Sequence, residues 1–209
     1  MTLTVRKAVR GDLPALLAIY ENARRFMQTH GNPTQWPAGY PGAARLTAEI
    51  DRGVCHVVTG AGEIQAVFCL IPGEDPTYRQ IEDGAWPEAV PYATIHRLAS
   101  AGRVGGIGRF CIDWCLQQGL PLRADTHANN IYMQRALTAT GFVRCGTIYT
   151  NATHPFVSDR CEFEDCAPFP TLPKGEYTMI TGFLIGMLRL VTNVITDTGK
   201  ATMDGAFWD

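Results

Sequence analysis

Glycine is concentrated between Arg103 and Gly108, in the run Arg-Val-Gly-Gly-Ile-Gly. The run lies between a strand-like segment that starts at Tyr92 and a helical pattern that starts at Ile107. A glycine-rich turn that enters a helix presents several backbone N–H groups at the positive end of the helix dipole. Such a turn suits a phosphate or a pyrophosphate, although a tight turn without a ligand has the same pattern. The spacing is neither that of a dinucleotide fold nor that of a nucleotide-hydrolysing loop.

The composition limits the classes of protein to consider. The chain has 209 residues, of which 46% are hydrophobic and 18% charged, so it can bury a core. A formal net charge of -2 provides no basic field for nucleic acid, and we expect no nucleic-acid partner. The seven cysteines lack the paired spacing of a zinc site, so we expect buried thiols, Cys111 and Cys115 among them, and no metal. The first residues lack the apolar stretch of a signal peptide, which favours the cytoplasm.

The elements that must position the glycine loop alternate between strands and helices. Strands are expected at 3–9, 55–59, 64–71, 92–99, 122–126 and 142–148. Helices are expected at 12–30, around 46–50, at 107–118 and at 130–140. This order predicts an α/β layer fold.

Two signatures in this order resemble those of the GNAT superfamily of N-acetyltransferases. The run from Arg103 to Gly108 is similar to the family's Arg/Gln-x-x-Gly-x-Gly/Ala, and the run from Asn130 to Phe142 is similar to its Asn-x-x-Ala-x-x-Leu-Tyr-x-x-x-Gly-Phe. The resemblance covers residues 3 to 149. It implies a mixed, mostly antiparallel central sheet that splays between its fourth and fifth strands, with helices on both faces.

The resemblance also implies acetyl-CoA as co-substrate. By motif position, the backbone of Leu98 and Ser100 would bind the pantetheine arm, which Asn130 would also contact. Arg109 and Arg135 would be partners for the ribose phosphate. The pyrophosphate would be surrounded by Arg103, Val104, Gly105, Gly106, Ile107, Gly108 and Arg109.

The reaction that the resemblance implies is attack of a neutral amine on a thioester, which needs a base to remove the ammonium proton. His96 is the first candidate, because it shares a strand face with Leu98, and His127 is the second. Glu82 or Asp83 acting through a water is the third. Either histidine could instead be a hydrogen-bonded core residue.

The general acid of the family is missing. Many relatives protonate the thiolate with the tyrosine of the second signature, and this chain has Leu137 there. Tyr132 lies five residues earlier, about 140° around the helix, and cannot replace it. A thiol is only weakly basic, so its release does not need a strong acid.

The acceptor side of such a fold is walled by the first helices and by the loop before the fourth strand. Phe26, Trp36, Glu82 and Asp83 are the residues there that we expect to bind the substrate. Aromatic rings beside carboxylates suit a cationic amine. The alternative is that these loops only pack against the domain.

Residues 150–209 extend beyond the resemblance, so we expect a domain at 1–149 followed by an atypical extension. A strand that ends at Ile148 would leave an open sheet edge, and we predict that part of 156–182 pairs beside it. The apolar stretch 177–195 contains Arg189, and we expect it to pack on the domain or on a second copy in a homodimer, not to span a membrane. An extension without function is the alternative.

The sequence thus predicts a cytoplasmic GNAT N-acetyltransferase that transfers an acetyl group from acetyl-CoA to a primary amine of a small molecule or protein. The rival prediction is a non-catalytic acyl-CoA-binding or interaction module of the same fold. Leu137 and the extension favour the rival.

Overall fold

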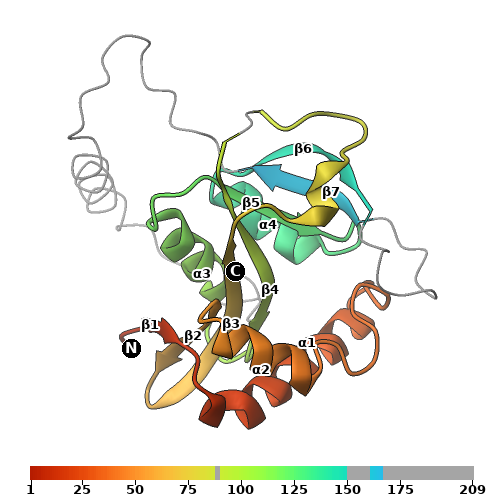
Figure 1. The fold of residues 1–209 in the computed structure, drawn as a ribbon. Helices are drawn as coiled ribbons and strands as arrows, with labels where there is room; N and C mark the ends of the chain where they lie inside the picture. Colours follow the sequence, from red (N-terminus) through yellow and green to blue (C-terminus); the bar gives the residue numbers. More distant parts are fainter. Residues whose placement is uncertain (88–89, 150–160, 167–209) are drawn as a thin grey trace, which may run out of the picture.

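The computed structural model describes residues 1–87, 90–149 and 161–166, and its strands form one mixed sheet in the order β1-β2-β3-β4-β5-β7-β6 (Figure 1). The strands are β1 Thr4–Lys7, β2 Cys55–Gly60, β3 Glu63–Pro72, β4 Ala93–Ser100, β5 Leu122–Thr126, β6 Val143–Ile148 and β7 Cys161–Cys166. The helices are α1 Leu13–Thr29, α2 Ala43–Asp51, α3 Ile107–Leu116 and α4 Ile131–Ala139, with short 3-10 turns η1 Arg10–Asp12 and η2 Pro76–Arg79. The predicted order of elements up to residue 148 is confirmed.

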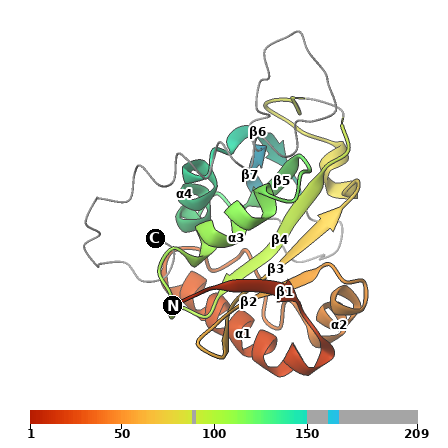
Figure 2. The same cartoon turned by 90° about the vertical axis from the view of Figure 1, so that its left-hand side faces the viewer.

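Helices cover both faces of the sheet, as predicted, and each face has its own core. On one face, α1 and α2 bury Leu16, Tyr20 and Leu46 against β2 and β3. On the other face, α3 and α4 bury Ile112 and Leu137 against β3, β4 and β5. Figure 2 shows α3 and α4 beside each other on this second face. No helix within the described ranges combines the length and the hydropathy that crossing a bilayer requires.

The cysteines of α3 belong to the second core. Cys111 and Cys115 lie four residues apart on the buried side of the helix, and neither is exposed. Burial raises the pKa of both thiols above the usual range. Their predicted role in packing is confirmed.

The pairing of β4 with β5 is short. The two strands run parallel and pair only at Ala93–Leu122, Thr94–Arg123 and Ile95–Ala124, although β4 continues to Ser100. Beyond Ile95 and Ala124 the two strands no longer pair. Leu98 of β4 and Thr126 of β5 instead line a common cleft, which shows that the strands diverge. The other pairs among the described strands are antiparallel. The predicted mixed, mostly antiparallel sheet that splays between β4 and β5 is confirmed.

A β-bulge interrupts β4 just beyond the last parallel pair. Cys69 of β3 faces His96 and Val67 faces Ala99, so two residues of β4 oppose the single residue between them. Arg97 is one of the two, and its φ of 54° is rarely adopted by a residue with a side chain.

Strand β7 lies inside the sheet between β5 and β6 and is antiparallel to both. It falls within 156–182 and pairs with Val143–Ile148, as predicted. However, it does not cover the edge of the sheet, because β6 is the outermost strand. The apolar stretch 177–195 lies outside the described residues.

The loop before β4 covers the outer edge of β6 instead. Glu82 and Thr147 exchange two backbone hydrogen bonds of 2.8 Å, and the N–H of Ala85 donates to the carbonyl of Cys145 at 3.0 Å. The approach is so close that a methyl group on Gly84 would lie 1.8 Å from that carbonyl oxygen. The edge is therefore hydrogen-bonded, although none of the described strands lies beyond β6 in the sheet.

The position of β7 predicts that the sheet depends on it. A chain that ends at Tyr149 leaves β5 and β6 without their shared partner, and we expect its melting temperature to fall by about 5 °C or more. A chain that ends at residue 168 retains β7 and is the matched control. Equal melting temperatures of the two chains in a thermal scan would show that β7 contributes no stability.

Candidate active site

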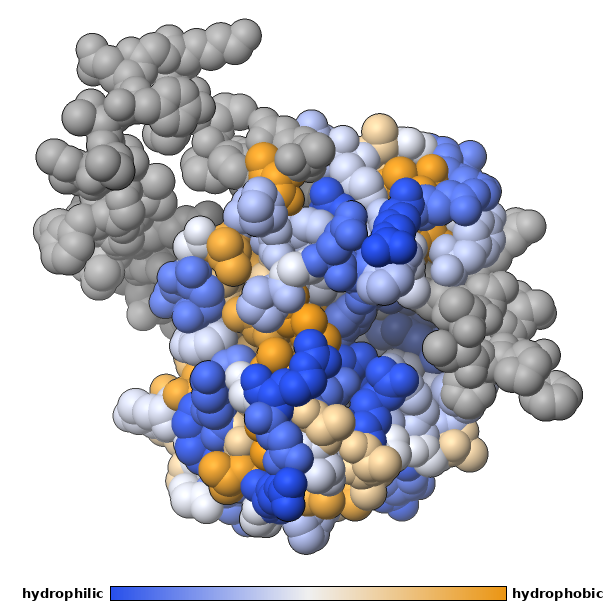
Figure 3. Space-filling model, viewed as in Figure 1, coloured by the Kyte–Doolittle hydropathy of each residue, from blue (hydrophilic) through white to orange (hydrophobic). Residues whose placement is uncertain are grey.

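A cleft opens where β4 and β5 diverge. Figure 3 shows the molecule hollowed between the part that carries β5 to β7 and the part that carries α1 and α2. The cleft is lined from α1 and the loop after it, from both strands and from the start of α4. The lining consists of Ala23, Met27, Gln35, Trp36, Tyr40, Ile95, His96, Arg97, Leu98, Asp125, Thr126, Asn130 and Met133.

The bulge in β4 decides which side chains enter this cleft. Successive residues of a regular strand point to opposite faces, so His96 and Arg97 would normally be separated by the sheet. The extra residue of the bulge lets both line the same cleft. The polar part of the site thus depends on an irregular strand.

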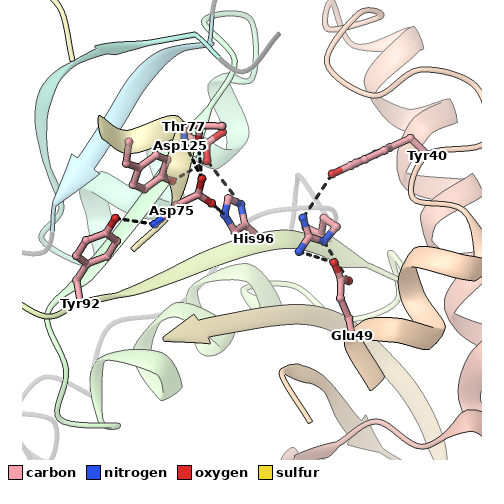
Figure 4. Close-up of polar contacts among 9 residues, drawn as sticks. Tyr40, Glu49, Asp75, Thr77, Tyr92, His96 and Asp125 are labelled. Atoms are coloured by element: carbon pink, nitrogen blue, oxygen red, sulfur yellow. Dashed lines mark hydrogen bonds and ion pairs between the residues drawn. The ribbon is translucent and has the colours of Figure 1, made fainter. Parts of the chain in front are cut away.

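His96 lies between two carboxylates, as Figure 4 shows. Its Nε2 is 2.9 Å from Oδ2 of Asp75, and its Nδ1 is 3.6 Å from Oδ1 of Asp125. Asp75 also accepts hydrogen bonds from the N–H and the hydroxyl of Thr77, at 2.9 and 2.7 Å. The hydrogen bond with His96, together with those from Thr77, holds the pKa of Asp75 well below its usual range.

These contacts define the tautomer of His96. Asp75 is ionised and can only accept a hydrogen bond, so Nε2 must carry the hydrogen that is donated to it. In the neutral ring, Nδ1 then has the lone pair. This nitrogen faces Asp125, which lines the cleft and accepts a hydrogen bond of 2.7 Å from the hydroxyl of Tyr78.

Arg97 is held on the other side by a buried ion pair. Its Nη2 lies 2.7 Å from Oε1 of Glu49 on α2, and the two side chains are only 7% and 5% exposed. The hydroxyl of Tyr20 on α1 donates to the carbonyl of Arg97 at 2.8 Å. The bulge is thus fixed by two helices through both its side chain and its backbone.

The structure brings together only some of the predicted site residues. His96, Trp36, Leu98 and Asn130 line the cleft, whereas His127, Phe26, Glu82 and Asp83 do not. His127 is buried, and its Nδ1 accepts a hydrogen bond of 3.1 Å from the N–H of Asn129.

The other predicted acceptor residues pack elsewhere. Phe26 stacks on His30 at 3.9 Å between ring centroids and contacts Tyr132 of α4. Glu82 is exposed on the loop over β6 and accepts a hydrogen bond from the hydroxyl of Tyr149, and the neighbouring Asp83 is also exposed. Within the described ranges, no three His, Cys, Asp or Glu residues gather to hold a metal ion.

The predictions missed Asp75 and Asp125 as neighbours of His96. Asp75 follows the third strand and precedes Pro76-Thr77, a pattern typical of a capping residue. Asp125 lies one residue beyond Ala124, which pairs with Ile95, so it reaches the level of His96 on the neighbouring strand. Only the parallel register of β4 and β5 could have revealed this.

The predicted phosphate loop has the expected local geometry. Gly106 directly precedes α3 with a φ of 71°, and the N–H of Gly102 bonds to Oγ of Ser100 at 2.9 Å. Gly105 is exposed, so a ligand can reach this part of the loop. Arg103 lies 3.0 Å from Glu63 of β3, and Arg109 lies 3.6 Å from Asp113.

Asn130 joins the start of α4 to the loop after α1. Its Oδ1 accepts a hydrogen bond from the N–H of Met133 at 3.1 Å, and its Nδ2 donates to Oε1 of Gln35 at 2.8 Å. Gln35 also accepts from Asn32. The side chain at the start of the second signature therefore connects two of the elements that line the cleft.

Comparison with known proteins identifies the fold. No family model and no curated protein matches the sequence. Among solved structures, a GNAT-family acetyltransferase from Streptococcus agalactiae matches with a TM-score of 0.65 and 24% identity, over 80% of this chain and 96% of that one. A GNAT-family acetyltransferase from Listeria monocytogenes matches with a TM-score of 0.57 and 17% identity, over 78% and 93%. The ribosomal-protein-alanine N-acetyltransferase of Brucella melitensis matches with a TM-score of 0.52 and 22% identity, over 79% and 99%.

The protein is an α/β protein, and its sheet splays beside a glycine loop. The chain has the GNAT fold, so the resemblance of its two signatures is confirmed at the level of the fold.

The glycine loop predicts a test of coenzyme A binding. We expect Gly106→Val to weaken coenzyme A binding by about tenfold or more, because the side chain obstructs the approach of a phosphate to the loop amides. Valine is also strained at this φ, so Gly119→Val is the control. Gly119 has a φ of 78° at the other end of α3, with nothing within 4 Å of a new Cβ. Equal affinities of the two variants in calorimetry would contradict a phosphate site in the loop.

The lowered pKa of Asp75 predicts an acid-sensitive stability. The pKa of Asp75 is lower in the folded protein than in the unfolded chain, so the stabilisation by its ionised carboxylate is complete above about pH 5 and is lost as pH falls toward the folded value. We expect Asp75→Asn to be less stable than wild type at neutral pH, and the difference to shrink by about 1–2 kcal/mol between about pH 5 and pH 2. Urea unfolding across this range measures it, with the exposed Asp113→Asn as control. Identical pH dependence in wild type and Asp75→Asn would contradict the assigned hydrogen bonds.

Proposed function

We propose that this protein is an N-acetyltransferase that transfers the acetyl group of acetyl-CoA to a primary amine of a small molecule or protein. The observation that carries the proposal is His96, whose Nδ1 has its lone pair at the cleft between β4 and β5. The GNAT fold supports it, because the solved structures that share this fold include acetyltransferases.

The residues of the cleft fit acetyl-CoA. Leu98 of β4 lines the cleft beyond the last pair of residues that joins β4 to β5. The glycine loop starts at Arg103, after Ser100 and two intervening residues. Oγ1 of Thr126, on the opposite wall, is buried and makes no hydrogen bond within the described part of the chain. A buried hydroxyl without a partner is costly, and a polar group of a bound ligand such as a pantetheine amide would satisfy it. When bound, acetyl-CoA supplies the thioester that the amine attacks.

His96 is the base in this proposal. A neutral imidazole takes a proton most readily near neutral pH, and Nδ1 is the nitrogen that can accept it. When it does, the charged ring lies between the carboxylates of Asp75 and Asp125. His127 and a water held by Glu82 or Asp83 are the alternatives.

No tyrosine donates a proton from the position used in many relatives. Leu137 is fully buried in the core between α4 and the sheet, and it has no hydroxyl. The thiolate of coenzyme A is a good leaving group, so the reaction proceeds without this acid.

The absence of a tyrosine at position 137 favours a second candidate, a non-catalytic acyl-CoA-binding module. Release of free thiol from acetyl-CoA in the presence of a panel of amines separates the two. Turnover supports the enzyme, whereas tight acetyl-CoA binding with no thiol released with any amine supports the binding module.

Removal of His96 tests its role. We expect His96→Ala to lower turnover by about 10² or more and to remove the acidic limb of the pH–rate profile, because that limb reports the base. His56→Ala is the matched control, since His56 of β2 is also buried and does not line the cleft. If His96→Ala keeps the acidic limb and a near-normal rate, the role passes to His127 or to a water-mediated carboxylate.

A further inference from the structure

The two carboxylates beside His96 differ in what they can still bind. Asp75 already accepts hydrogen bonds from His96 and from both groups of Thr77, and it does not line the cleft. Asp125 lines the cleft and accepts from Tyr78 through one oxygen. Asp125 is therefore the carboxylate that can meet a ligand.

The space between Asp125 and His96 suits a hydrogen-bond donor from a ligand. In the neutral ring, Nδ1 of His96 and Oδ1 of Asp125 are both hydrogen-bond acceptors, and the two atoms lie 3.6 Å apart. The two side chains are only 14% and 17% exposed, so water solvates them poorly. An ammonium group has three N–H donors and a positive charge, and one such group satisfies both acceptors.

The other residues of the cleft limit which further groups a bound amine can have. Asp125 is the only acidic residue of the lining in the described part of the chain. Met27, Trp36 and Tyr40 form an apolar and aromatic wall from α1 and the loop after it, and Arg97 is already paired with Glu49. A second ammonium group would find no second carboxylate among the described residues of the lining, whereas an alkyl or aromatic stem would be buried favourably.

We infer that the acceptor is a monoamine with an apolar stem, that Asp125 binds its ammonium group, and that Asp75 positions His96 to take the proton. The transfer step of this inference rests on the proposed function. The binding of the amine does not.

The chemistry balances with these groups. The ammonium gives one proton to Nδ1 of His96, and the freed lone pair of its nitrogen forms the C–N bond. The C–S bond of the thioester breaks, and the thiolate takes its electron pair and then a proton that the new amide nitrogen releases. His96 returns its proton to solvent, so one ammonium and one thioester become one amide, one thiol and one proton.

Binding of three probes to the full chain tests the site. The probes are 2-phenylethylamine, the neutral isostere 2-phenylethanol and the dication 1,4-diaminobutane, titrated by calorimetry with and without coenzyme A. We expect wild type to bind the monoamine about tenfold or more tighter than either other probe. Asp125→Asn should lose the preference for the amine over the alcohol, because it removes the charge and retains the shape.

Two control variants separate charge from structure. The amide oxygen of Asp125→Asn can still accept the hydroxyl of Tyr78, and Tyr78→Phe removes that hydrogen bond but retains the carboxylate. Asp51→Asn neutralises an exposed carboxylate paired with Arg10, outside the cleft. Both controls should bind 2-phenylethylamine within about threefold of wild type.

Kinetics with acetyl-CoA distinguish the two carboxylates. Asp125→Asn should raise the KM for the amine by about tenfold or more, whereas Asp75→Asn should lower kcat by about tenfold or more without changing amine binding. Asp75→Glu should recover part of kcat, which a purely structural loss would not.

The inference fails if Asp125→Asn binds the monoamine as wild type does, or if wild type prefers the alcohol or the dication. Amine turnover that is insensitive to Asp125 would overturn the inference and leave the proposed function standing. Amine binding that depends on Asp125, with no thiol released, would overturn the proposed function and leave the ammonium site standing.

Discussion

The end of the parallel pairing between β4 and β5 is the constraint on which the rest of the site depends. Three residue pairs join the strands, and beyond Ile95 and Ala124 each strand continues without the other. Diverging strands expose backbone groups and inward-facing side chains that a closed sheet would bury. The bulge at Arg97 lies just past this point, and His96 and Arg97 both line the opening.

The loop before β4 connects this opening to the far edge of the sheet. At one end Asp75 holds His96, and further along Glu82 forms two backbone hydrogen bonds with β6. Arg123 of β5 lies between the rings of Trp86 and Tyr92, with its guanidinium carbon 3.6 and 3.9 Å from their centroids. A loop anchored on β5 and β6 can hold the carboxylate of Asp75 rigidly beside the ring of His96.

The elements were predictable because each has a strong local signal. Helix α3 follows a left-handed glycine and buries residues at a spacing of three and four, and β2 and β3 flank a tight turn at Gly62. Strand β7 was predictable only as a pairing partner for β6, since an open edge demands one. Its place between β5 and β6 could not be predicted, because period-two patterning does not specify which neighbour a strand chooses.

The sequence by itself determined the fold class and the glycine loop and singled out His96 as the first candidate for the base, because signatures and periodicities are local properties of the chain. Tertiary structure decided the partners of that histidine. Asp75, His96 and Asp125 are separated by 21 and 29 positions along the chain, and no local pattern links them. The register of two parallel strands and the path of one loop bring them together, and both depend on packing across the whole sheet.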